Sequence, residues 1–452
     1  MKKFSLGEAA EAINAKLYNA KPETMVEAVG SDSREVPANS LFVAVKGEFF
    51  DGHKYSRSAV ENGALCVLSH EHLDSDIPYI LVEDTRYAFL DLAKWYLDQF
   101  NIPVVAITGS VGKTTTKDMV YSVLSQKYKV LKNEGNFNNE VGMPLTIFNI
   151  DESHEIAVLE MGMNSFGEIH NLSKAATPEV CVITNIGNAH IGKLGSKEGI
   201  LEAKSEIFDF ADKNAVAILN SDDEMLKKLS HKAGSTLFFG TDEAAFCRAR
   251  KLDDLGIKGS IWRVYIGEDN FMITIPLPGD YLIHNAMAAI CVGRYYGVSD
   301  NSIAAAIKHF KPSKNRIDLI EINGITLVND VYNASPVSMK AMIDSLSHSD
   351  GRKVCIFGDM LELGDDSVAY HEEVGCHAGQ AKIELLLCAG EFAPVYEAAY
   401  KKAKGKNSIV FESVEMLIEE AANHIKKGDI VLVKASRGMK FERIIEKLKR
   451  CL

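Results

Sequence analysis

The chain has 452 residues, of which 46% are hydrophobic and 25% are charged, close to the average for globular proteins. At about 150 residues per domain, this length predicts three domains. With 50 Lys and Arg residues against 62 Asp and Glu residues, the net charge of −12 excludes a general basic field that would attract nucleic acid or anionic lipid. We therefore expect no nucleic-acid partner, and any anionic ligand has to be held by a local site.

The N-terminal segment is predicted to be a surface helix. Apolar residues recur at helical spacing from Leu6 to Leu17, and Glu8 and Glu11 interrupt any signal-peptide core. No apolar run approaches the roughly 18 to 20 residues that span a bilayer. The eight cysteines are scattered without C-x-x-C pairs, which is typical of core thiols in a reducing compartment. These features predict a cytoplasmic protein without a membrane span.

Short strand-like runs separated by turns mark the first part of the chain. They lie at 41–45, 64–69 and 79–84, and a helical pattern follows at 86–100. Pro103 then stands directly before another apolar run, and proline disfavours a helical conformation in the residue before it. We therefore predict a small α/β domain over residues 1–102.

The next part alternates buried-type strands with helical segments. The strands are predicted at 104–108, 156–162, 180–187 and 215–220, and this alternation is typical of a parallel sheet covered on both faces. A β-like patch at 261–279 precedes an alanine-rich helix. Proline, serine and a charge cluster near residue 313 suggest a second boundary, after which the α/β alternation resumes. The predicted fold class is α/β, with a mostly parallel central domain over 103–312 and a Rossmann-like α/β domain over 313–452.

The strongest local signal is the segment VVAITGSVGKTTTKDM at 104–119, a buried strand that leads through a glycine turn into a helix. Glycines allow backbone N–H groups to approach phosphate oxygens, and the helix N-terminus adds a positive dipole. Lys113 can then reach the β- and γ-phosphates, and Thr114 can ligate Mg²⁺. Ile107 occupies the position where the strict eight-residue phosphate-loop pattern has glycine. The segment predicts a nucleotide site with a shortened loop.

Three further residues are candidates because of their positions relative to predicted strands and helices. Glu160 ends an apolar strand, where a carboxylate can hold magnesium. His190 follows the strand VITNIG, and Lys204 lies in a helical segment 14 residues later (204 − 190). A solvated strand end, a structural histidine and a solvated lysine would explain them equally well. Spacing alone does not identify this site.

Motifs along nearly the whole chain resemble those of the Mur ligases, the ADP-forming amide ligases of peptidoglycan synthesis. TGSVGKTTT, EGNFNNEVGMPLT, LEMGMNSFGEI, TNIGNAHIG and EAKSEIF occur in the family's order. SDSREVPANSLFVAVKGEFFDGH extends the resemblance into the first domain, and NDVYNASPVSM, GDMLELGDDS and VLVKASRGMKFE extend it into the third. LEMGMNSFGEI favours the family members that join D-alanyl-D-alanine to UDP-N-acetylmuramoyl-tripeptide through an acyl phosphate.

The resemblance implies a role for each matching residue. ATP would be held by Gly109, Ser110, Gly112, Lys113, Thr114 and Thr115, with Asn285 at the adenine, Arg316 at a phosphate and Asp330 at the ribose. Two Mg²⁺ ions would be held by Thr114, Glu160, His190 and a carbamylated Lys204, so that Lys113, His190 and Lys204 form the catalytic set. The substrates would contact Ser31, Ser33, Arg34, Gly47, Asp51, His53 and Asn333.

Some interpretations stay open at this point. The polar residues of the first domain also suit ordinary turns. Ser335 and the segment PGDYLIHN depart from the family pattern, which leaves the dipeptide and adenine contacts open. Another Mur-type ligase, a folylpolyglutamate-type ligase, or a phosphate-loop NTPase switch are alternatives, although the switch would give His190 and Lys204 no role. We expect a monomer, but the sequence leaves open the oligomeric state, the domain arrangement, and whether lysine or diaminopimelate is the third peptide residue.

Overall fold

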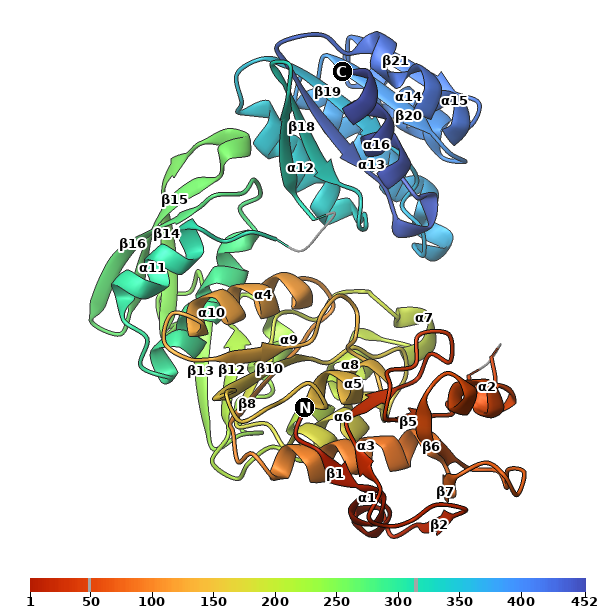
Figure 1. The fold of residues 1–452 in the computed structure, drawn as a ribbon. Helices are drawn as coiled ribbons and strands as arrows, with labels where there is room; N and C mark the ends of the chain where they lie inside the picture. The colour runs from red at the N-terminus through yellow and green to blue at the C-terminus, as the bar shows by residue number, and fades with distance from the viewer. Residues whose placement is uncertain (48–49, 313–315) are drawn as a thin grey trace. The chain divides into compact units, whose positions relative to one another are not determined.

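The computed structural model describes residues 1–47, 50–312 and 316–452 (Figure 1). The chain forms two compact units, one of Met1–Cys247 with Met287–Ile303 and the other of Arg248–Ala286 with Ala304–Leu452. Helices and strands alternate along both units, so the predicted α/β class is confirmed. The predicted boundary near Ser313 lies outside the described residues.

A five-stranded sheet forms the N-terminal part of the first unit, in the order β2-β7-β6-β5-β4. Its strands are β2 (Lys16–Tyr18), β4 (Ala28–Gly30), β5 (Ser40–Val43), β6 (Ala64–Ser69) and β7 (Tyr79–Leu81). The separate strands β1 (Phe4–Ser5) and β3 (Met25–Val26) pair antiparallel, and the helices are α1 (Leu6–Ala12), α2 (Ser56–Glu61) and α3 (Thr85–Asp98).

The N-terminal helix is shorter than predicted. It begins at a capping box in which Ser5 accepts from the Glu8 N–H, and it ends at Ala12. Asn14 follows with φ of 50°, a left-handed conformation that stops a helix and that asparagine tolerates better than most residues. Leu17, predicted to be helical, therefore lies in β2.

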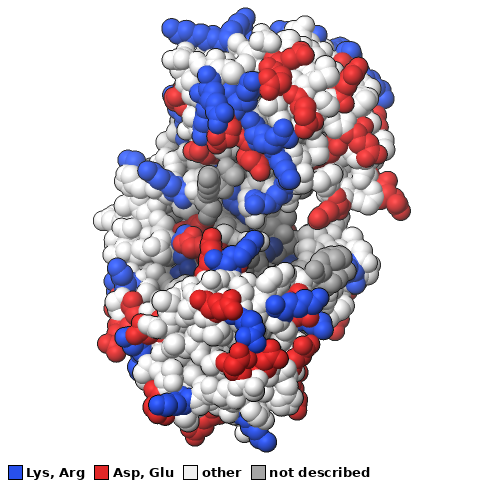
Figure 2. Space-filling view, turned by 45° about the vertical axis from the view of Figure 1, so that its right-hand side comes forward, with Lys and Arg blue, Asp and Glu red and all other residues white. Residues whose placement is uncertain are grey.

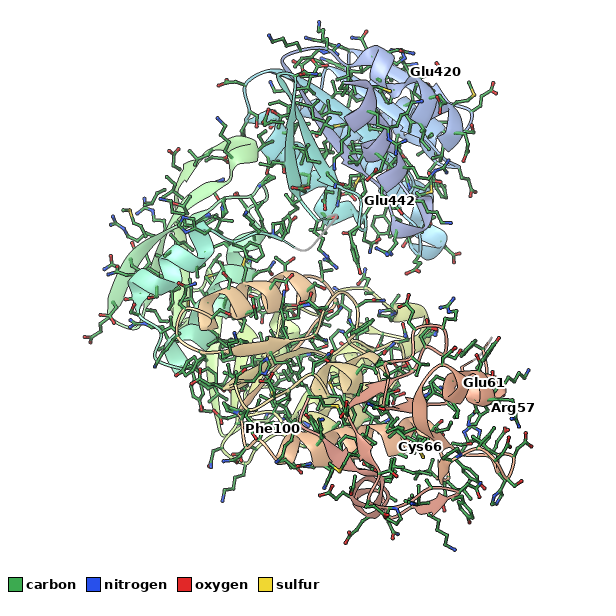
Figure 3. All side chains as sticks on the ribbon, in the orientation of Figure 1. Arg57, Glu61, Cys66, Phe100, Glu420 and Glu442 are labelled. Carbon is green, nitrogen blue, oxygen red and sulfur yellow. The ribbon has the colours of Figure 1, made fainter. Side chains whose placement is uncertain are left out.

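The cysteines and the charged side chains of this part separate between interior and surface. Cys66 lies inside the domain, whereas Arg57 and Glu61 of α2 lie on its outer side (Figure 3). All eight cysteines are free, and six of them are buried. The prediction of core thiols is wrong for Cys451, which is exposed on the C-terminal helix, and only partly right for Cys376, which is half-buried.

The first unit also contains a parallel array in the order β9-β10-β8-β11-β12-β13. Its strands are β8 (Val104–Thr108), β9 (Val130–Lys132), β10 (Ile156–Glu160), β11 (Val180–Ile183), β12 (Val216–Asn220) and β13 (Ser235–Gly240). The helices that follow them are α4 (Lys113–Leu124), α5 (Gly142–Ile147), α6 (Glu168–Ala176), α7 (Ile191–Leu194), α8 (Lys197–Ser205) and α9 (Glu224–Lys227). Every residue of β8 is buried, as expected for a parallel sheet covered on both faces.

The second unit contains a six-stranded sheet in the order β17-β18-β22-β19-β20-β21. Its strands are β17 (Asp318–Ile322), β18 (Ile325–Asp330), β19 (Arg352–Phe357), β20 (Leu385–Ala389), β21 (Asn407–Phe411) and β22 (Asp429–Lys434), all parallel except the β17–β18 pair. Its helices are α12 (Pro336–Ser347), α13 (Ser367–Gln380), α14 (Ala393–Lys402), α15 (Val414–Glu420) and α16 (Glu442–Cys451).

The remaining elements confirm the predicted β-like patch and the helix after it. Strands β15 (Ser260–Ile266) and β16 (Asp269–Ile275) form an antiparallel hairpin. Strand β14 (Cys247–Asp254) precedes them, and α10 (Leu282–Tyr295) and α11 (Asp300–Lys308) follow. Within the described ranges, each helix is too short or too polar to cross a membrane. Figure 2 shows Lys and Arg intermixed with Asp and Glu on the face in view, without an extended basic field.

His371 in α13 is a fully buried histidine that fixes a loop of the second unit. Its Nδ1–H donates to the Ser367 carbonyl at 2.6 Å, and its Nε2 accepts from the Met360 N–H at 2.9 Å. The ring also stacks on Phe392, with centroids 4.3 Å apart. Burial lowers the pKa of His371 from its ordinary value of 6.5, because a charged imidazolium would lose its hydration and its acceptor nitrogen.

We predict that this unit loses stability as pH falls below 6.5, because the unfolded chain then binds a proton that the buried His371 resists. His371→Gln, which cannot titrate, should show a flatter dependence of Tm on pH in that range. Circular dichroism melts at a series of pH values measure this. The matched control is His309→Gln at an exposed histidine. Identical pH slopes for His371→Gln and the wild type would contradict the prediction.

Candidate functional site

The loop between β8 and α4 is built to hold an anion. Gly109 and Gly112 have φ of +149° and +86°, conformations that favour glycine. Gly112 is the N-cap of the twelve-residue helix α4, and it makes no side-chain hydrogen bond to the first N–H groups of that helix. Free N–H groups and the helix dipole together make such an end suitable for phosphate.

The segment after β11 supports this loop from the neighbouring strand. The Asn185 carbonyl accepts from the Ser110 N–H at 3.0 Å, and its side-chain oxygen accepts from the Val111 N–H at 3.0 Å. The Thr184 hydroxyl donates to the Val111 carbonyl at 2.6 Å. This explains why the strand predicted at 180–187 ends at Ile183: the next residues hydrogen-bond to the loop instead of extending the sheet. Sequence reasoning noted the TNIG motif but missed this role.

The polar residues of the loop lie where they were predicted, between β8 and the first turn of α4. The Lys113 Nζ donates to the Gly109 carbonyl at 2.8 Å, and the Ser110 Oγ accepts from the Gly187 N–H at 2.8 Å. Thr114 is buried, and Thr115 is half-buried beside it. The loop therefore presents backbone N–H groups, hydroxyls and one ammonium group together.

Lys204 of α8 is buried, with only 2% of its surface exposed. Its amine has no hydrogen bond or ion pair to residues in the described parts of the chain. Burial, together with the positive charge of Lys113, lowers the pKa of Lys204 well below 10.5. The structure thus brings Lys204 close to the phosphate loop in a setting that favours the neutral amine. His190, exposed at the start of α7 with φ of 65°, lies on the helix that packs against α8.

Glu160 at the end of β10 is also buried, with 1% of its surface exposed. Its Oε1 accepts from the Asn138 Nδ2 at 2.7 Å. Its Oε2 has no hydrogen-bond partner among the residues that the structure describes. A buried carboxylate oxygen left in this state is costly unless a cation binds it. The donor set therefore fits Mg²⁺, which prefers oxygen ligands.

The candidate substrate residues of the first domain form hydrogen-bonded turns. Asp51 accepts from the His53 backbone N–H at 3.1 Å and from its Nδ1 at 2.8 Å. Arg34 donates to both Asp32 oxygens, at 2.9 and 2.6 Å. These hydrogen bonds lower the pKa of Asp32 to about 2. The Gly47 N–H donates to the Phe50 carbonyl at 2.7 Å. Ser31 is half-buried and Ser33 is buried.

One cluster around His53 has the composition of a metal site. Ligand atoms of His53, His70 and Glu71 lie within 4.8 Å of one another. However, the Nε2 of His53 already accepts from the His70 backbone N–H at 3.3 Å, while its Nδ1 faces Asp51. Both ring nitrogens thus have protein partners, and the cluster fixes the turn that carries Asp51. Sequence reasoning missed His70, because no recognisable motif includes it.

The remaining candidates lie in the second unit. Asn285 is buried in α10, and the Arg316 guanidinium stacks over the Tyr332 ring at 3.9 Å. Asp330 at the end of β18 pairs with the buried Lys434 at the end of β22, and Lys434 also donates to the Asn333 carbonyl at 2.9 Å. Lys434 was not predicted, although its position at the end of an apolar strand parallels that of Glu160.

The candidates are therefore divided between the two units. The first-domain residues, the phosphate loop, Glu160, His190 and Lys204 belong to the first unit, whereas Asn285, Arg316, Asp330 and Asn333 belong to the second. The first unit thus combines a phosphate loop, a carboxylate open to a cation, and a buried amine without a partner among the described residues. This combination is typical of ATP-dependent ligases.

The chain belongs to the Mur ligase family. The model of the Mur ligase middle domain matches residues 107–293, and the Mur ligase, glutamate ligase domain model matches 315–437. The model of the Mur ligase family, catalytic domain, matches 25–95. The predicted family and the predicted three-domain α/β fold are thereby confirmed, while the residue boundaries 1–102, 103–312 and 313–452 stay a prediction.

Among the curated relatives is the UDP-N-acetylmuramoyl-tripeptide–D-alanyl-D-alanine ligase of Bacillus subtilis (strain 168), 38% identical over 99% of both chains. The ligase of the same name from Haemophilus influenzae is 36% identical over 99% of both chains. A solved MurF ligase from Thermotoga maritima in complex with ADP is 33% identical, with a TM-score of 0.82 over 94% of this chain and 97% of that one. Folylpolyglutamate synthase of Mycobacterium tuberculosis, at 16% identity and a TM-score of 0.61 over 80% of this chain and 95% of that one, shares the fold.

We predict that Gly109→Ala weakens nucleotide binding. A Cβ at this position would lie 1.9 Å from the Thr184 Oγ1, so the loop would have to move away from the segment that supports it. ADP affinity, measured by isothermal titration calorimetry, should fall about tenfold or more, which corresponds to about 1.4 kcal/mol. Gly192→Ala is the matched control, because a Cβ there meets open space. Unchanged ADP affinity in folded Gly109→Ala would contradict this reading of the loop.

Proposed function

We propose that this chain is an ATP-dependent ligase that joins D-alanyl-D-alanine to UDP-N-acetylmuramoyl-tripeptide and forms ADP and phosphate. Its full-length similarity to ligases of that name supports the substrates. The observation that carries the reaction type is the position of Lys204, a buried amine that affects the Lys113 of a phosphate loop and has no partner in the part of the chain that the structure describes. An NTPase switch has no use for such an amine.

The chemistry requires an activated carboxylate. A free carboxylate does not form an amide readily at neutral pH, since oxide would be the leaving group. The terminal carboxylate of the tripeptide attacks the γ-phosphorus of ATP, which gives an acyl phosphate and ADP. The amine of the dipeptide then attacks the acyl carbon and expels phosphate. Positioning and electrostatic stabilisation provide most of the catalysis in such phosphoryl transfers.

Residues of the first unit would bind the phosphates during this step. The N–H groups of Gly109, Gly112 and Thr115 and the hydroxyls of Ser110 and Thr114 would contact the phosphates, and Lys113 would leave the Gly109 carbonyl for a phosphate oxygen. Its ammonium would then offset charge on the transferring phosphoryl group. In the second unit, Asn285, Arg316 and Asp330 would contact adenine, phosphate and ribose.

Magnesium would be held by Thr114, Glu160, His190 and a carbamate on Lys204. When bound, it supplies charge neutralisation on the phosphoryl group. The carbamate forms when the neutral amine of Lys204 adds to carbon dioxide and releases a proton, which leaves one negative charge shared by two oxygens on this side chain. This change also removes the repulsion between Lys204 and Lys113, and the lowered pKa of Lys204 favours it.

The UDP-sugar end of the substrate would contact Ser31, Ser33, Arg34, Gly47, Asp51 and His53, and the dipeptide would contact Asn333. The Arg34 guanidinium and the backbone turns of this region are suited to phosphate and sugar hydroxyl groups. We also propose that the enzyme acts as a monomer in the cytoplasm. Free cysteines throughout the chain are consistent with a reducing compartment.

We predict that tripeptide labelled with ¹⁸O in its terminal carboxylate transfers one labelled oxygen to inorganic phosphate for each amide formed. The attacking carboxylate oxygen becomes the bridge of the acyl phosphate, and it leaves with phosphate when the amine attacks. Mass spectrometry of the released phosphate measures the label. Unlabelled phosphate accompanying amide formation would contradict the acyl-phosphate route, and phosphate release without dipeptide would favour a hydrolytic NTPase.

We predict that Lys204 of the active enzyme carries a carbamate. In ¹³C-bicarbonate buffer, the wild type should show a carbamate carbonyl resonance by nuclear magnetic resonance, and Lys204→Arg should lack it because arginine stays charged. Lys197→Arg, at an exposed lysine of the same helix, is the matched control. Small carboxylates should partly restore turnover to Lys204→Ala. An active wild type without this resonance would rule the modification out.

A further inference from the structure

Lys117, one turn after Lys113 in α4, is a second buried lysine that the reaction described above does not use. It is fully buried, although a lysine within a helix normally reaches solvent. Its Nζ donates to the Asn133 carbonyl at 2.7 Å. It lies 3.7 Å from the Asp118 Oδ1 and 3.9 Å from the Glu160 Oε2. Burying an ammonium group is costly, so its retention here requires these anionic neighbours.

Asn133, whose carbonyl accepts from Lys117, hydrogen-bonds to both backbone groups of Glu160. Its Oδ1 accepts from the Glu160 N–H at 2.9 Å, and its Nδ2 donates to the Glu160 carbonyl at 3.0 Å. The same Nδ2 donates to the Phe137 carbonyl at 2.8 Å, which fixes the loop that follows. Lys117 therefore fixes Glu160 through its main chain as well as through charge.

The loop then reaches the carboxylate itself. Asn138 donates from Nδ2 to the Glu160 Oε1 at 2.7 Å, and its carbonyl accepts from the Gly162 N–H at 2.8 Å. Gly162 permits this close approach, since a Cβ there would lie 2.9 Å from the Asn138 side chain. Residues 134–138 belong to the motif EGNFNNEVG, to which the proposed reaction gives no role, and Asn133 directly precedes it.

We propose that Lys117 is a positioning residue that keeps the Glu160 carboxylate aligned while leaving its Oε2 open to a divalent cation. The ammonium directs its hydrogen bond to the Asn133 carbonyl and remains 3.9 Å from Oε2, beyond hydrogen-bond distance. Asn138 occupies Oε1, and Oε2 has no partner in the described ranges. Lys117 compensates the buried charge without occupying the ligand atom. This inference rests on the proposed metal role of Glu160.

The neighbouring ion pair provides a matched control. Lys132 donates to the Asp118 Oδ1 at 2.8 Å, and among the described residues its side chain has no hydrogen bond or ion pair with Asn133 or Glu160. Lys132→Met therefore removes a positive charge from the same side of α4 without removing the hydrogen bonds of Lys117, Asn133 and Asn138 that fix Glu160. Lys117→Met removes the ammonium and keeps a side chain of similar length, so a difference between the two variants reports on Glu160.

The experiment titrates Mn²⁺ into the full-length protein with saturating ADP and counts free Mn²⁺ by electron paramagnetic resonance. Loss of groups that orient a metal ligand typically weakens metal binding about 10- to 100-fold. We expect a loss of about tenfold or more in Mn²⁺ affinity for Lys117→Met, and unchanged affinity for Lys132→Met. Hydrogen exchange without metal should show faster exchange at the Glu160 and Gly162 amides in Lys117→Met only. Asn138→Ala, which removes no buried charge, should also weaken Mn²⁺ binding and serves if Lys117→Met does not fold.

The outcomes separate this inference from the proposed function. Glu160→Gln should weaken Mn²⁺ binding, and if it does not, the metal role of Glu160 fails. If Glu160→Gln weakens binding while folded Lys117→Met and Asn138→Ala bind Mn²⁺ as the wild type does, the positioning role is wrong. Tighter Mn²⁺ binding by Lys117→Met would also overturn it, since Lys117 would then be a competitor of the metal.

Discussion

The proximity of two lysines, Lys113 and Lys204, is the constraint on which the site depends. Two ammonium groups repel each other in partly desolvated surroundings, and this repulsion is unfavourable unless anions bind beside them. ATP phosphates and a carbamate would both relieve this repulsion. Bound phosphates would therefore stabilise the ammonium of Lys113, and without them the neutral form of Lys204 limits the repulsion.

Glu160 on β10 and Lys117 on α4 are also buried ionisable groups whose charges need compensation. Both are nearly or fully buried, and neither could keep its charge alone in such surroundings. The buried ammonium balances the carboxylate, and asparagine side chains fix its geometry. Among the described residues, the Lys204 amine has no partner, and the Glu160 carboxylate has a hydrogen bond at Oε1 and none at Oε2, so both leave one atom available to a ligand.

Local sequence patterns predicted the features that lie within one segment of chain. The strand–glycine–helix pattern located the phosphate loop, the apolar run before Glu160 located the end of β10, and the proline before Val104 located the start of β8. The motif resemblance predicted the family, which the comparisons confirmed. Predictions of strand ends were too long at 156–162 and 180–187, because apolar residues beyond Glu160 and Ile183 look like strand but lie in loops that support the site.

Contacts between distant segments could not be predicted in this way. Lys117, Lys204 and Lys434 are buried, yet a lysine in a helix or at a strand end normally reaches solvent, and no local pattern distinguishes them. Asn133 contacts Glu160 across 27 residues, and Lys434 contacts Asp330 across 104. Such pairings depend on sheet order and register, which one sequence does not contain.

The order of the parallel strands also decides where the chemistry occurs. From β8 the chain crosses to β9 on one side, and from β10 it crosses to β11 on the other, so β8 and β10 lie at a point where the winding direction reverses. Because crossovers are right-handed, α4 and α6 lie on opposite faces of the sheet (Figure 1). A crevice opens between diverging loops at the carboxyl ends of such strands. The connectivity of the chain thus places the phosphate loop, which follows β8, and Glu160, which ends β10, at the same reversal of winding.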